Sequence, residues 1–439
     1  VGSEMCIRDR YPQRTKMAYP AEQPIDLKLA SYGPMQEGWA PSGTLPNERL
    51  PEGVKRPLLF EPLKLRQVKG DVTLKNRVVV SPMCQYSSVD GFPTPYHLAH
   101  LGQYALHGAG AIVVEASGVV PEGRISPQDL GMYKEEHVPA HASLVASLKS
   151  FGEGVKVGLQ IAHAGRKAST WAPFHRGEHK TPYAPAAQGG WPESAVGASA
   201  IPFDQGHVNP KQLTKEQIKQ VEDAFVLAAD RAYRAGYDFV EVHGAHGYLL
   251  SSFNSPLSNH RDDEYGGSFE KRTKLMLDIV RRIRAAHPDK ALWLRVNGTD
   301  GMEHEKVESW TLESLKKLAP LVEEAGVDLL DVSGGGVVPG NLFSKKPGYQ
   351  VPYTTAAKSL GLKKLLLGSV GQLHVGTPDA PEKAGLLAEK TLQDDHADVI
   401  SIARGFLENP SWVEDAAKNL VNVSSARAVQ YDYAVKSMS

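Results

Sequence analysis

Eight short apolar runs, each followed by a segment with helical periodicity, constrain the fold of this chain more than any other feature. The runs cover residues 77–83, 111–117, 156–163, 239–245, 291–297, 329–335, 364–371 and 398–405. The clearest helices between them span 214–236, with Thr214 as the expected N-cap, and 309–325, which Gly326 closes. This alternation is typical of repeated βα units with a parallel sheet. The sequence therefore predicts an α/β fold, a (β/α)8 TIM barrel.

The alternative is an open, doubly wound parallel sheet. That fold usually carries a glycine-rich G-x-G-x-x-G turn after its first strand, and no such turn follows residues 77–83. The absence favours the barrel.

The domain organisation follows from how composition and periodicity change along the chain. Residues 1–57 are rich in Pro and Gly without periodicity, which predicts an irregular N-terminal extension. Its opening VGSEMCIRDR, within residues 1–16, resembles translated sequencing adaptor more than protein, so Met17 is the expected start. Residues 58–425 form the predicted barrel, with a long insertion at 164–213 that we expect to cover a substrate. Residues 426–439 form a C-terminal tail.

Charge and cysteine content exclude several classes of function. The formal net charge is −1, from 49 basic and 50 acidic residues, with no basic block, so we expect neither nucleic acid nor an anionic membrane as partner. No apolar run approaches the roughly 20 residues that cross a bilayer. The two cysteines, Cys6 and Cys84, cannot build a disulfide framework or a clustered metal site. A reducing compartment fits this content, and we expect a cytoplasmic protein.

Polar and small residues gather where the predicted strands end. They are Cys84, Ala116, Gln160, His243, Arg295, the glycines at 334–336, Gly371 and Arg404. In FVEVHGA, strand periodicity puts Phe239, Glu241 and His243 on one face. Because the C-terminal ends of barrel strands form one rim, a polar ligand is expected there. Each residue alone could equally be a hydrogen-bonded barrel residue.

The turns after the seventh and eighth runs are the usual phosphate site of a barrel. The turn 368–371 (GSVG) offers close-approach backbone N–H groups, and Arg404 offers a fixed cation. A plain glycine turn beside a surface arginine is the competing interpretation.

From about Leu58 to Glu414 the chain resembles the Old Yellow Enzyme family of FMN-dependent ene-reductases, particularly its thermophilic-like, YqjM-like branch. The matching stretches are NRVVVSPMCQYSS (76–88), VVEASGVVPEGRIS (113–126), GLQIAHAGRKAS (158–169), EVHGAHGYLLSSFNSPLSNHRDDEYGGSFEKR (241–272), LRVNGTD (294–300), VGQL (370–373) and ARGFLENP (403–410). The 241–272 stretch is the most specific of these.

The resemblance implies a set of FMN contacts. The implied cofactor-binding residues are Ser81, Pro82, Met83, Cys84, Ala116, Gln160, His243, Arg295, Gly371, Ala403 and Arg404. Among them Cys84 would tune the flavin, Arg295 would stabilise the negative charge of the reduced ring, and Arg404 would hold the phosphate. An inert buried thiol is the alternative for Cys84.

The resemblance also implies the catalytic set. His243 and His246 would hydrogen-bond the substrate carbonyl, and Tyr248 would supply the proton that follows hydride transfer. Tyr86 would border the substrate, or it would simply pack. Two histidines three residues apart can also bind zinc, but no third ligand has metal-site spacing, so no metal is expected.

The expected activity is NAD(P)H-dependent reduction of the C=C bond of α,β-unsaturated carbonyl compounds through FMN, with NADPH or NADH as donor. A redox-neutral flavin isomerase and a non-catalytic barrel that binds FMN or a phosphorylated ligand are the alternatives. Members of this branch often place an arginine after a Val-Gln-Tyr segment into a neighbouring subunit. Here Asp432 and Tyr433 follow residues 429–431, so a homo-oligomer is open but its arginine finger is not evident.

Overall fold

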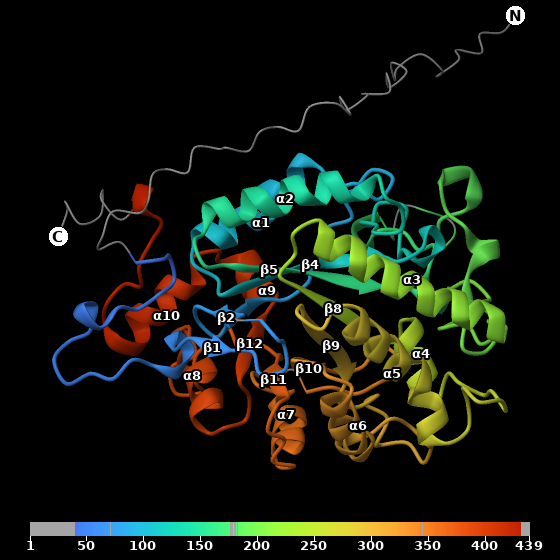
Figure 1. Ribbon diagram of the computed structural model, residues 1–439. Helices are drawn as coiled ribbons and strands as arrows, with labels where there is room; N and C mark the ends of the chain where they lie inside the picture. Colours follow the sequence, from blue (N-terminus) through green and yellow to red (C-terminus); the bar gives the residue numbers. More distant parts are fainter. Residues whose placement is uncertain are drawn as a thin grey trace, which may run out of the picture. The chain divides into compact units, whose positions relative to one another are not determined.

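A closed ring of parallel strands organises the chain. The structure is a computed structural model that describes residues 40–431 except 71, 176–178, 180, 182 and 345. Within these residues eight strands form the ring: β3 (Val78–Val80), β4 (Ala111–Gly118), β5 (Lys156–Ala162), β8 (Phe239–Gly244), β9 (Ala291–Asn297), β10 (Leu329–Ser333), β11 (Leu366–Ser369) and β12 (Val399–Ile402). They neighbour one another in chain order, and β12 pairs with β3 in parallel. The predicted (β/α)8 barrel is confirmed, and an open sheet is excluded (Figure 1).

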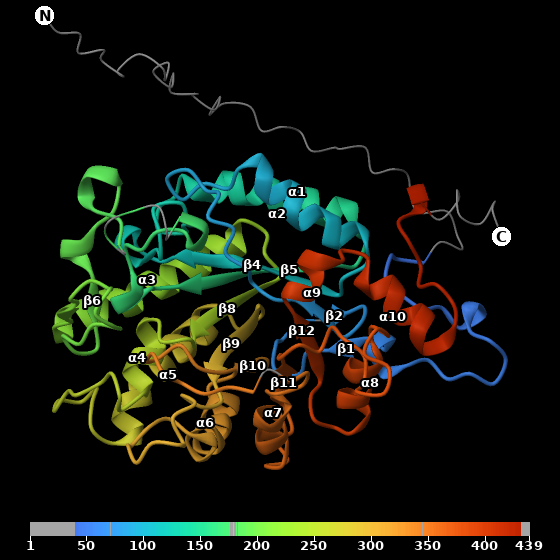
Figure 2. The same cartoon turned by 180° about the vertical axis from the view of Figure 1, so that it is seen from behind.

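Helices cover the outside of the ring (Figures 1 and 2). They are α1 (Pro95–Leu106), α2 (His137–Phe151), α3 (Lys215–Arg234), α4 (Leu249–Asn254), α5 (Phe269–Ala286), α6 (Leu312–Glu324), α7 (Val351–Lys358), α8 (Leu386–Gln393), α9 (Arg404–Glu408) and α10 (Trp412–Val421). Helix α3 begins as predicted, because the Thr214 side chain accepts from the Gln217 N–H and the Gln217 side chain accepts from the Thr214 N–H. Helix α6 begins two residues after Trp310, since Thr311 is its N-cap.

The N-terminal end of the barrel interior is closed and apolar. A two-stranded antiparallel hairpin, β1 (Leu63–Lys64) and β2 (Thr73–Leu74), precedes the barrel, and its leucines pack on the first residues of the barrel strands. Here the rings of Phe239 and Trp293 stack with their centroids 3.8 Å apart. Gly158 leaves room for this stack, because a Cβ there would lie 2.0 Å from the Phe239 ring. We call this apolar region the closed end.

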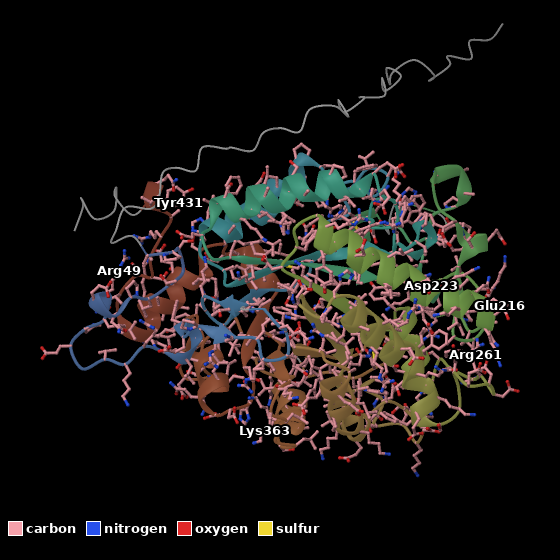
Figure 3. The ribbon with its side chains drawn as sticks, in the orientation of Figure 1. Arg49, Glu216, Asp223, Arg261, Lys363 and Tyr431 are labelled. Atoms are coloured by element: carbon pink, nitrogen blue, oxygen red, sulfur yellow. The ribbon has the colours of Figure 1, made fainter. Side chains whose placement is uncertain are left out.

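The described part of the expected extension, residues 40–57, consists of loops, turns and one 3₁₀ turn. The described residues from 40 to 431 form one compact unit with the barrel, and Leu45 is buried in its core. The Ala426 N–H donates to the Thr44 carbonyl, and Arg49 Nη1 donates to the Ser425 carbonyl. Figure 3 labels Arg49 and Tyr431, from the two ends of the described chain, on this side of the unit.

The insertion at 164–213 consists mostly of loops and 3₁₀ turns. Its regular part is a two-stranded parallel sheet of β6 (Val196–Gly197) and β7 (Lys211–Gln212). None of the helices in the described ranges combines the length and apolar character that a bilayer crossing requires. The interpretations of residues 1–16, of Met17 and of residues 432–433 fall outside the described residues.

Candidate active site

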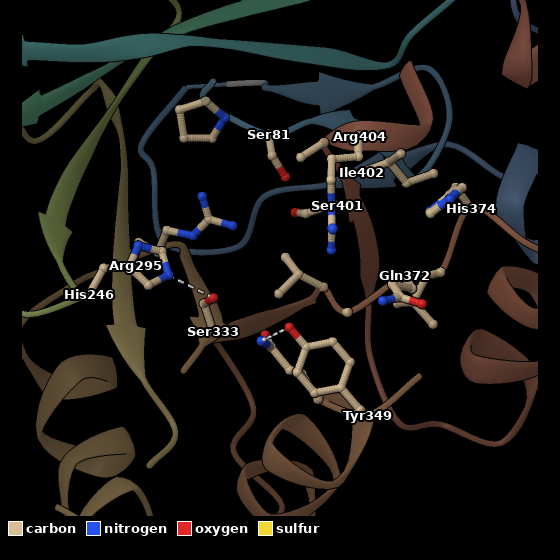
Figure 4. A pocket seen from close by; sticks show the side chains of 16 residues that line it. Ser81, His246, Arg295, Ser333, Tyr349, Gln372, His374, Ser401, Ile402 and Arg404 are labelled. Atoms are coloured by element: carbon tan, nitrogen blue, oxygen red, sulfur yellow. Dashed lines mark hydrogen bonds between the residues drawn. The ribbon is translucent and has the colours of Figure 1, made fainter. Parts of the chain in front are cut away.

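A cavity of about 230 Å³ lies at the C-terminal end of the barrel strands, opposite the closed end (Figure 4). It is lined by Ser81, Pro82, His246, Arg295, Ser333, Tyr349, Gln350, residues 370–374 and residues 401–404. The lining therefore contains several residues that the sequence predicts for cofactor or substrate: Ser81, Pro82, His246, Arg295, Gly371, Ala403 and Arg404. We call this region the open end of the barrel.

One side of the cavity is suited to a phosphate. Arg404 stands at the start of α9, and its guanidinium extends into the cavity between Ser401 and Gln372 (Figure 4). Gly371 has a φ of 110° in the turn after β11, and a Cβ there would lie 3.0 Å from the Gln350 backbone nitrogen. This turn and cation are what an anionic group needs.

The other side of the cavity carries buried polar atoms that are available to a ligand. Arg295 on β9 is 6% exposed, and Ser81, just after β3, is 2% exposed. Among the described residues, Arg295 Nε and Ser81 Oγ have no hydrogen-bond partner. An unsatisfied buried polar group costs about 1–3 kcal/mol, so such atoms at a cavity wall indicate a polar ligand. A cavity with an arginine and a glycine turn on one side and these unsatisfied polar atoms on the other fits the FMN that the resemblance implies.

His243, His246 and Tyr248 come together at the end of β8. The His243 ring centroid is 5.3 Å from that of His246 and 5.1 Å from that of Tyr248. His246 Nε2 lies 2.8 Å from Ser333 Oγ at the end of β10 (Figure 4). Three groups able to exchange protons thus stand side by side, with His246 in the cavity wall.

His246 adopts a left-handed backbone conformation, with a φ of 61°. Its N–H donates to Asn297 Oδ1 (3.0 Å), and its carbonyl accepts from Lys167 Nζ (2.8 Å). A non-glycine residue in this region costs of order 1–3 kcal/mol and persists only where neighbours hold it. The two hydrogen bonds supply that restraint on the backbone, and the contact with Ser333 Oγ orients the ring.

Both histidines are held in the neutral form. Burial, with the nearby Arg295 and Lys167, lowers the pKa of His246 to about 3. Burial, with His246, Arg295 and Lys167, holds the pKa of His243 well below its usual range. A neutral imidazole can donate its N–H to a carbonyl oxygen without first having to be protonated.

Lys167 is a site residue that the sequence interpretation missed. It lies at the start of the 164–213 insertion, and its ammonium donates to the carbonyls of His246 and Gly336, both at 2.8 Å. The same nitrogen is 5.1 Å from the centroid of the Tyr248 ring. The insertion is therefore tied to the loops after β8 and β10, directly beside the predicted proton donor.

Two acidic residues beneath the cavity were not assigned a role either. Glu241 on β8 and Asp331 on β10 are buried, and Gln160 Nε2 donates to Glu241 Oε1 at 2.7 Å. Arg295 Nη2 lies 3.5 Å from Asp331 Oδ2. Periodicity put Glu241 on the same face as His243, which was a usable signal.

The remaining predicted residues stand outside the cavity lining given above. Cys84 and Tyr248 are half-buried and pack on one small apolar cluster of Ile125, Ala164 and Ala168. Burial, with the nearby Asp129 and Glu115, raises the pKa of the Cys84 thiol. The cysteine is therefore held as a thiol, packed on the same apolar cluster as Tyr248.

Tyr86, Met83 and Ala116 also lie outside the cavity lining. The Tyr86 ring stands edge-on to Phe174, with centroids 6.0 Å apart. Met83 packs against the barrel core, and Ala116 is buried in β4. Within the described residues, no group of three or more His, Cys, Asp or Glu side chains is placed to hold a metal ion.

Comparison with known proteins identifies one family whose model matches the whole barrel. The model of the family described as NADH:flavin oxidoreductase / NADH oxidase matches residues 58–422. An NADPH dehydrogenase of Bacillus licheniformis is 40% identical over 380 residues, which cover 86% of this chain and 98% of that protein. An NADH:flavin oxidoreductase of Gibberella zeae is 40% identical over 389 residues, covering 85% and 89%.

Solved structures share the fold at lower identity. Morphinone reductase matches with a TM-score of 0.65 and 22% identity, over 85% of this chain and 92% of that one. A 2-naphthoyl-CoA reductase complex matches with a TM-score of 0.70 and 24% identity, over 84% of this chain and 54% of that one. At these identities the likeness supports the barrel fold alone.

Proposed function

The chain belongs to the NADH:flavin oxidoreductase / NADH oxidase family, as its resemblance to Old Yellow Enzyme predicted, and we propose that it reduces activated carbon–carbon double bonds. It is an FMN-dependent NAD(P)H oxidoreductase. The proposed substrates are small α,β-unsaturated aldehydes and ketones and related electron-poor alkenes. The observation that carries the proposal is the cluster of two neutral histidines and a tyrosine, His243, His246 and Tyr248, of which His246 lines the cavity.

We assign the cofactor to the two sides of the cavity. Arg404 and the turn at 370–374 would hold the phosphate, and Ser81, Pro82 and Arg295 would border the ring. Bound FMN supplies hydride transfer, and NAD(P)H and the alkene use it in turn. The orphaned polar atoms of Ser81 and Arg295 support this orientation, since a ring with acceptor atoms would satisfy them.

The histidines and the tyrosine have separate tasks in the proposed reaction. The imidazole N–H groups of His243 and His246 donate to the substrate carbonyl, which draws electron density from the β-carbon. One preorganised donor of this kind is worth about 10²–10³ in rate. Because both imidazoles are neutral and already fixed, no proton has to be gained before the substrate binds. Tyr248 then donates its phenolic proton to the α-carbon.

Product analysis under anaerobic conditions tests the proposal. The FMN-loaded protein is incubated with 2-cyclohexenone, with and without NADPH that carries deuterium at the transferred position. We expect cyclohexanone labelled at the β-carbon, and no reaction without NAD(P)H. An isomerised alkene formed without NAD(P)H would favour the isomerase, and no product from the loaded protein would favour a binding protein.

We further propose that one chain completes the site. Within the described residues, Arg427 precedes the 429–431 segment and pairs with Glu414 of the same chain, with Arg427 Nε 2.8 Å from Glu414 Oε2. This pairing within one chain is the observation that supports the proposal. Activity per chain should then stay constant on dilution, and a loss parallel to dissociation would contradict it. NADPH over NADH and a cytoplasmic location stay predictions.

A further inference from the structure

A buried charged layer separates the closed end of the barrel from the cavity. It consists of Gln160, Glu241, Arg295, Asp331 and Ser401, which come from five different strands. Glu241 is fully buried and Asp331 is 2% exposed. Of the three charged residues in this layer, Arg295 alone lines the cavity. The two carboxyl groups can therefore interact with a ligand in the cavity only indirectly, by way of the Arg295 side chain.

The charges of this layer do not balance when both carboxyl groups are ionised. Arg295 is the one cation facing them from the packed strands of the described barrel, while Gln160 on β5, Ser401 on β12 and His243 on β8 are neutral. Removing an uncompensated ion from water costs several kcal/mol. Burial accordingly raises the pKa of Glu241 to about 8 and raises that of Asp331.

The hydrogen bonds that Glu241 and Asp331 accept occupy one oxygen of each carboxyl group, so the other oxygen can bind a proton. Gln160 Nε2 donates to Glu241 Oε1 at 2.7 Å, and Ser401 Oγ donates to Asp331 Oδ2 at 3.3 Å. The other oxygen of each carboxyl group, Glu241 Oε2 and Asp331 Oδ1, has no partner among the described residues. A proton on either oxygen removes the unbalanced charge without breaking a hydrogen bond that exists.

We propose that the Glu241–Asp331 pair takes up one proton from solvent when the cofactor beside Arg295 is reduced, and releases it on reoxidation. Negative charge that develops against Arg295 competes with the carboxylates for the same cation, and a like charge nearby favours the protonated carboxyl. The inference rests on the proposed position of FMN. Glu241 and Asp331 act through Arg295 and are positioning residues.

The step balances in atoms and electrons. NAD(P)H supplies two electrons and one proton as hydride, and the cofactor gains one negative charge. The second proton comes from solvent and forms an O–H bond on one carboxylate oxygen of the pair. When the hydride passes to the alkene, that O–H bond ionises and the proton returns to solvent.

The test is the reduction potential of the FMN-loaded protein as a function of pH. Below the raised pKa of Glu241 the layer holds its proton in both redox states, and hydride chemistry alone sets the slope. Above this pKa, reduction of the cofactor also binds one proton to the pair. The equilibrium constant of reduction then changes by a further factor of ten per pH unit. The slope of potential against pH therefore steepens by about 30 mV per unit for a two-electron couple. Ionisation of the reduced cofactor itself would make the slope shallower with rising pH, so the two are distinguishable.

Glu241→Gln should abolish the steepening, because an amide still accepts from Gln160 but does not titrate. The matched control is Asp300→Asn, since Asp300 is a buried carboxyl outside the layer whose pKa burial raises to about 6. In Asp300→Asn, the steepening of the potential–pH slope near pH 8 should persist. A wild-type slope that never steepens between pH 6 and 10, or a steepening that survives in Glu241→Gln, would overturn the proposal.

A second measurement needs no variant. The redox-difference infrared spectrum of the wild-type protein at pH 9 should gain a protonated carboxyl band on reduction, and a spectrum without that band would also overturn it. Neither measurement uses an alkene. A failure of alkene reduction with an intact pH break would thus count against the proposed activity and leave this inference standing.

Discussion

The two ends of the barrel interior are built from the same strands, yet they differ completely in chemistry. On β8, Phe239 faces inward at the closed end, Glu241 lies one layer above, and His243 reaches the open end. On β9, Trp293 stacks on Phe239, and Arg295 two residues later lines the cavity. The change from apolar packing to polar function thus takes four residues of strand.

The comparison shows how a barrel separates stability from function. Burying a large apolar side chain stabilises a fold by about 1.5–3 kcal/mol, whereas each unsatisfied buried polar group costs about 1–3 kcal/mol. The closed end mainly makes the first kind of contribution, with Trp293 Nε1 as a buried atom that has no partner among the described residues, and Ser81, Arg295 and His243 at the open end carry the second kind of cost. Substitutions at one end should therefore leave the property of the other end intact.

Tyr248→Phe should have the largest effect at the open end. Loss of a positioned general acid slows a proton-dependent step by roughly 10²–10⁴-fold. We expect this loss in the reoxidation of the reduced protein by weakly activated alkenes, measured by stopped-flow absorbance, with reduction by NADPH unchanged. Thermal stability should change little. Tyr349→Phe is the matched control, because Tyr349 is a tyrosine of the cavity lining that is not part of the His243–His246–Tyr248 cluster. Equal rates for Tyr248→Phe and wild type would remove Tyr248 from its role.

Phe239→Ala should have the largest effect at the closed end. Truncating a buried phenylalanine costs about 3–5 kcal/mol in free energy of unfolding, and here it also removes the stacking partner of Trp293. Urea unfolding measures the loss, and Phe239→Leu should cost less. FMN affinity of the folded fraction should stay near that of wild type. A stable variant with weakened FMN binding would break the separation of the two ends.

Arg404→Gln should weaken FMN binding without destabilising the barrel. A hydrogen bond to a charged group is worth about 1.5–3 kcal/mol, which corresponds to roughly a 10- to 150-fold higher dissociation constant. Fluorescence titration of the apoprotein with FMN measures it. Arg404→Lys keeps the positive charge and should recover part of the affinity. An unchanged constant in Arg404→Gln would place the phosphate elsewhere.

Glu414→Gln should have the smallest effect on the free energy of unfolding and should affect neither end of the barrel. Arg427 and Lys418 lower the pKa of Glu414 to about 2, from an ordinary value of 4.5. Because the folded pKa is depressed, the contribution is fully present above pH 4.5 and is lost as pH falls toward 2. Solvent screening limits it to about 1 kcal/mol. Unfolding at pH 7 and pH 3 should differ less in the variant than in wild type, and an equal difference would contradict the pairing.

The parts of the fold that sequence predicts are those with a local signal. The eight strands carry apolar runs, and the N-cap Thr214 precedes a clear amphipathic helix. The hairpin of β1 and β2 was missed because two-residue strands have no periodicity to detect. The burial of Leu45 was missed because its partners lie far away in the chain.

The same limit applies to the site. Residues of the open end could be placed on the rim from strand periodicity, and their roles came from the family resemblance. The Glu241–Asp331 layer needed the register of several strands, since Gln160 pairs with Glu241 and Arg295 with Asp331 across separate strand pairs. The hydrogen bond from Lys167 to the His246 carbonyl needed a loop path that periodicity does not specify.

Visible absorption during an anaerobic titration tests the central claim, that the open end binds FMN and passes its reducing equivalents to an activated alkene. The FMN-loaded protein, freed of excess cofactor, should be yellow. One equivalent of NADPH should bleach it, and one equivalent of 2-cyclohexenone should restore the colour. A protein that retains no flavin, or a bleached protein that the enone does not reoxidise, would contradict the account.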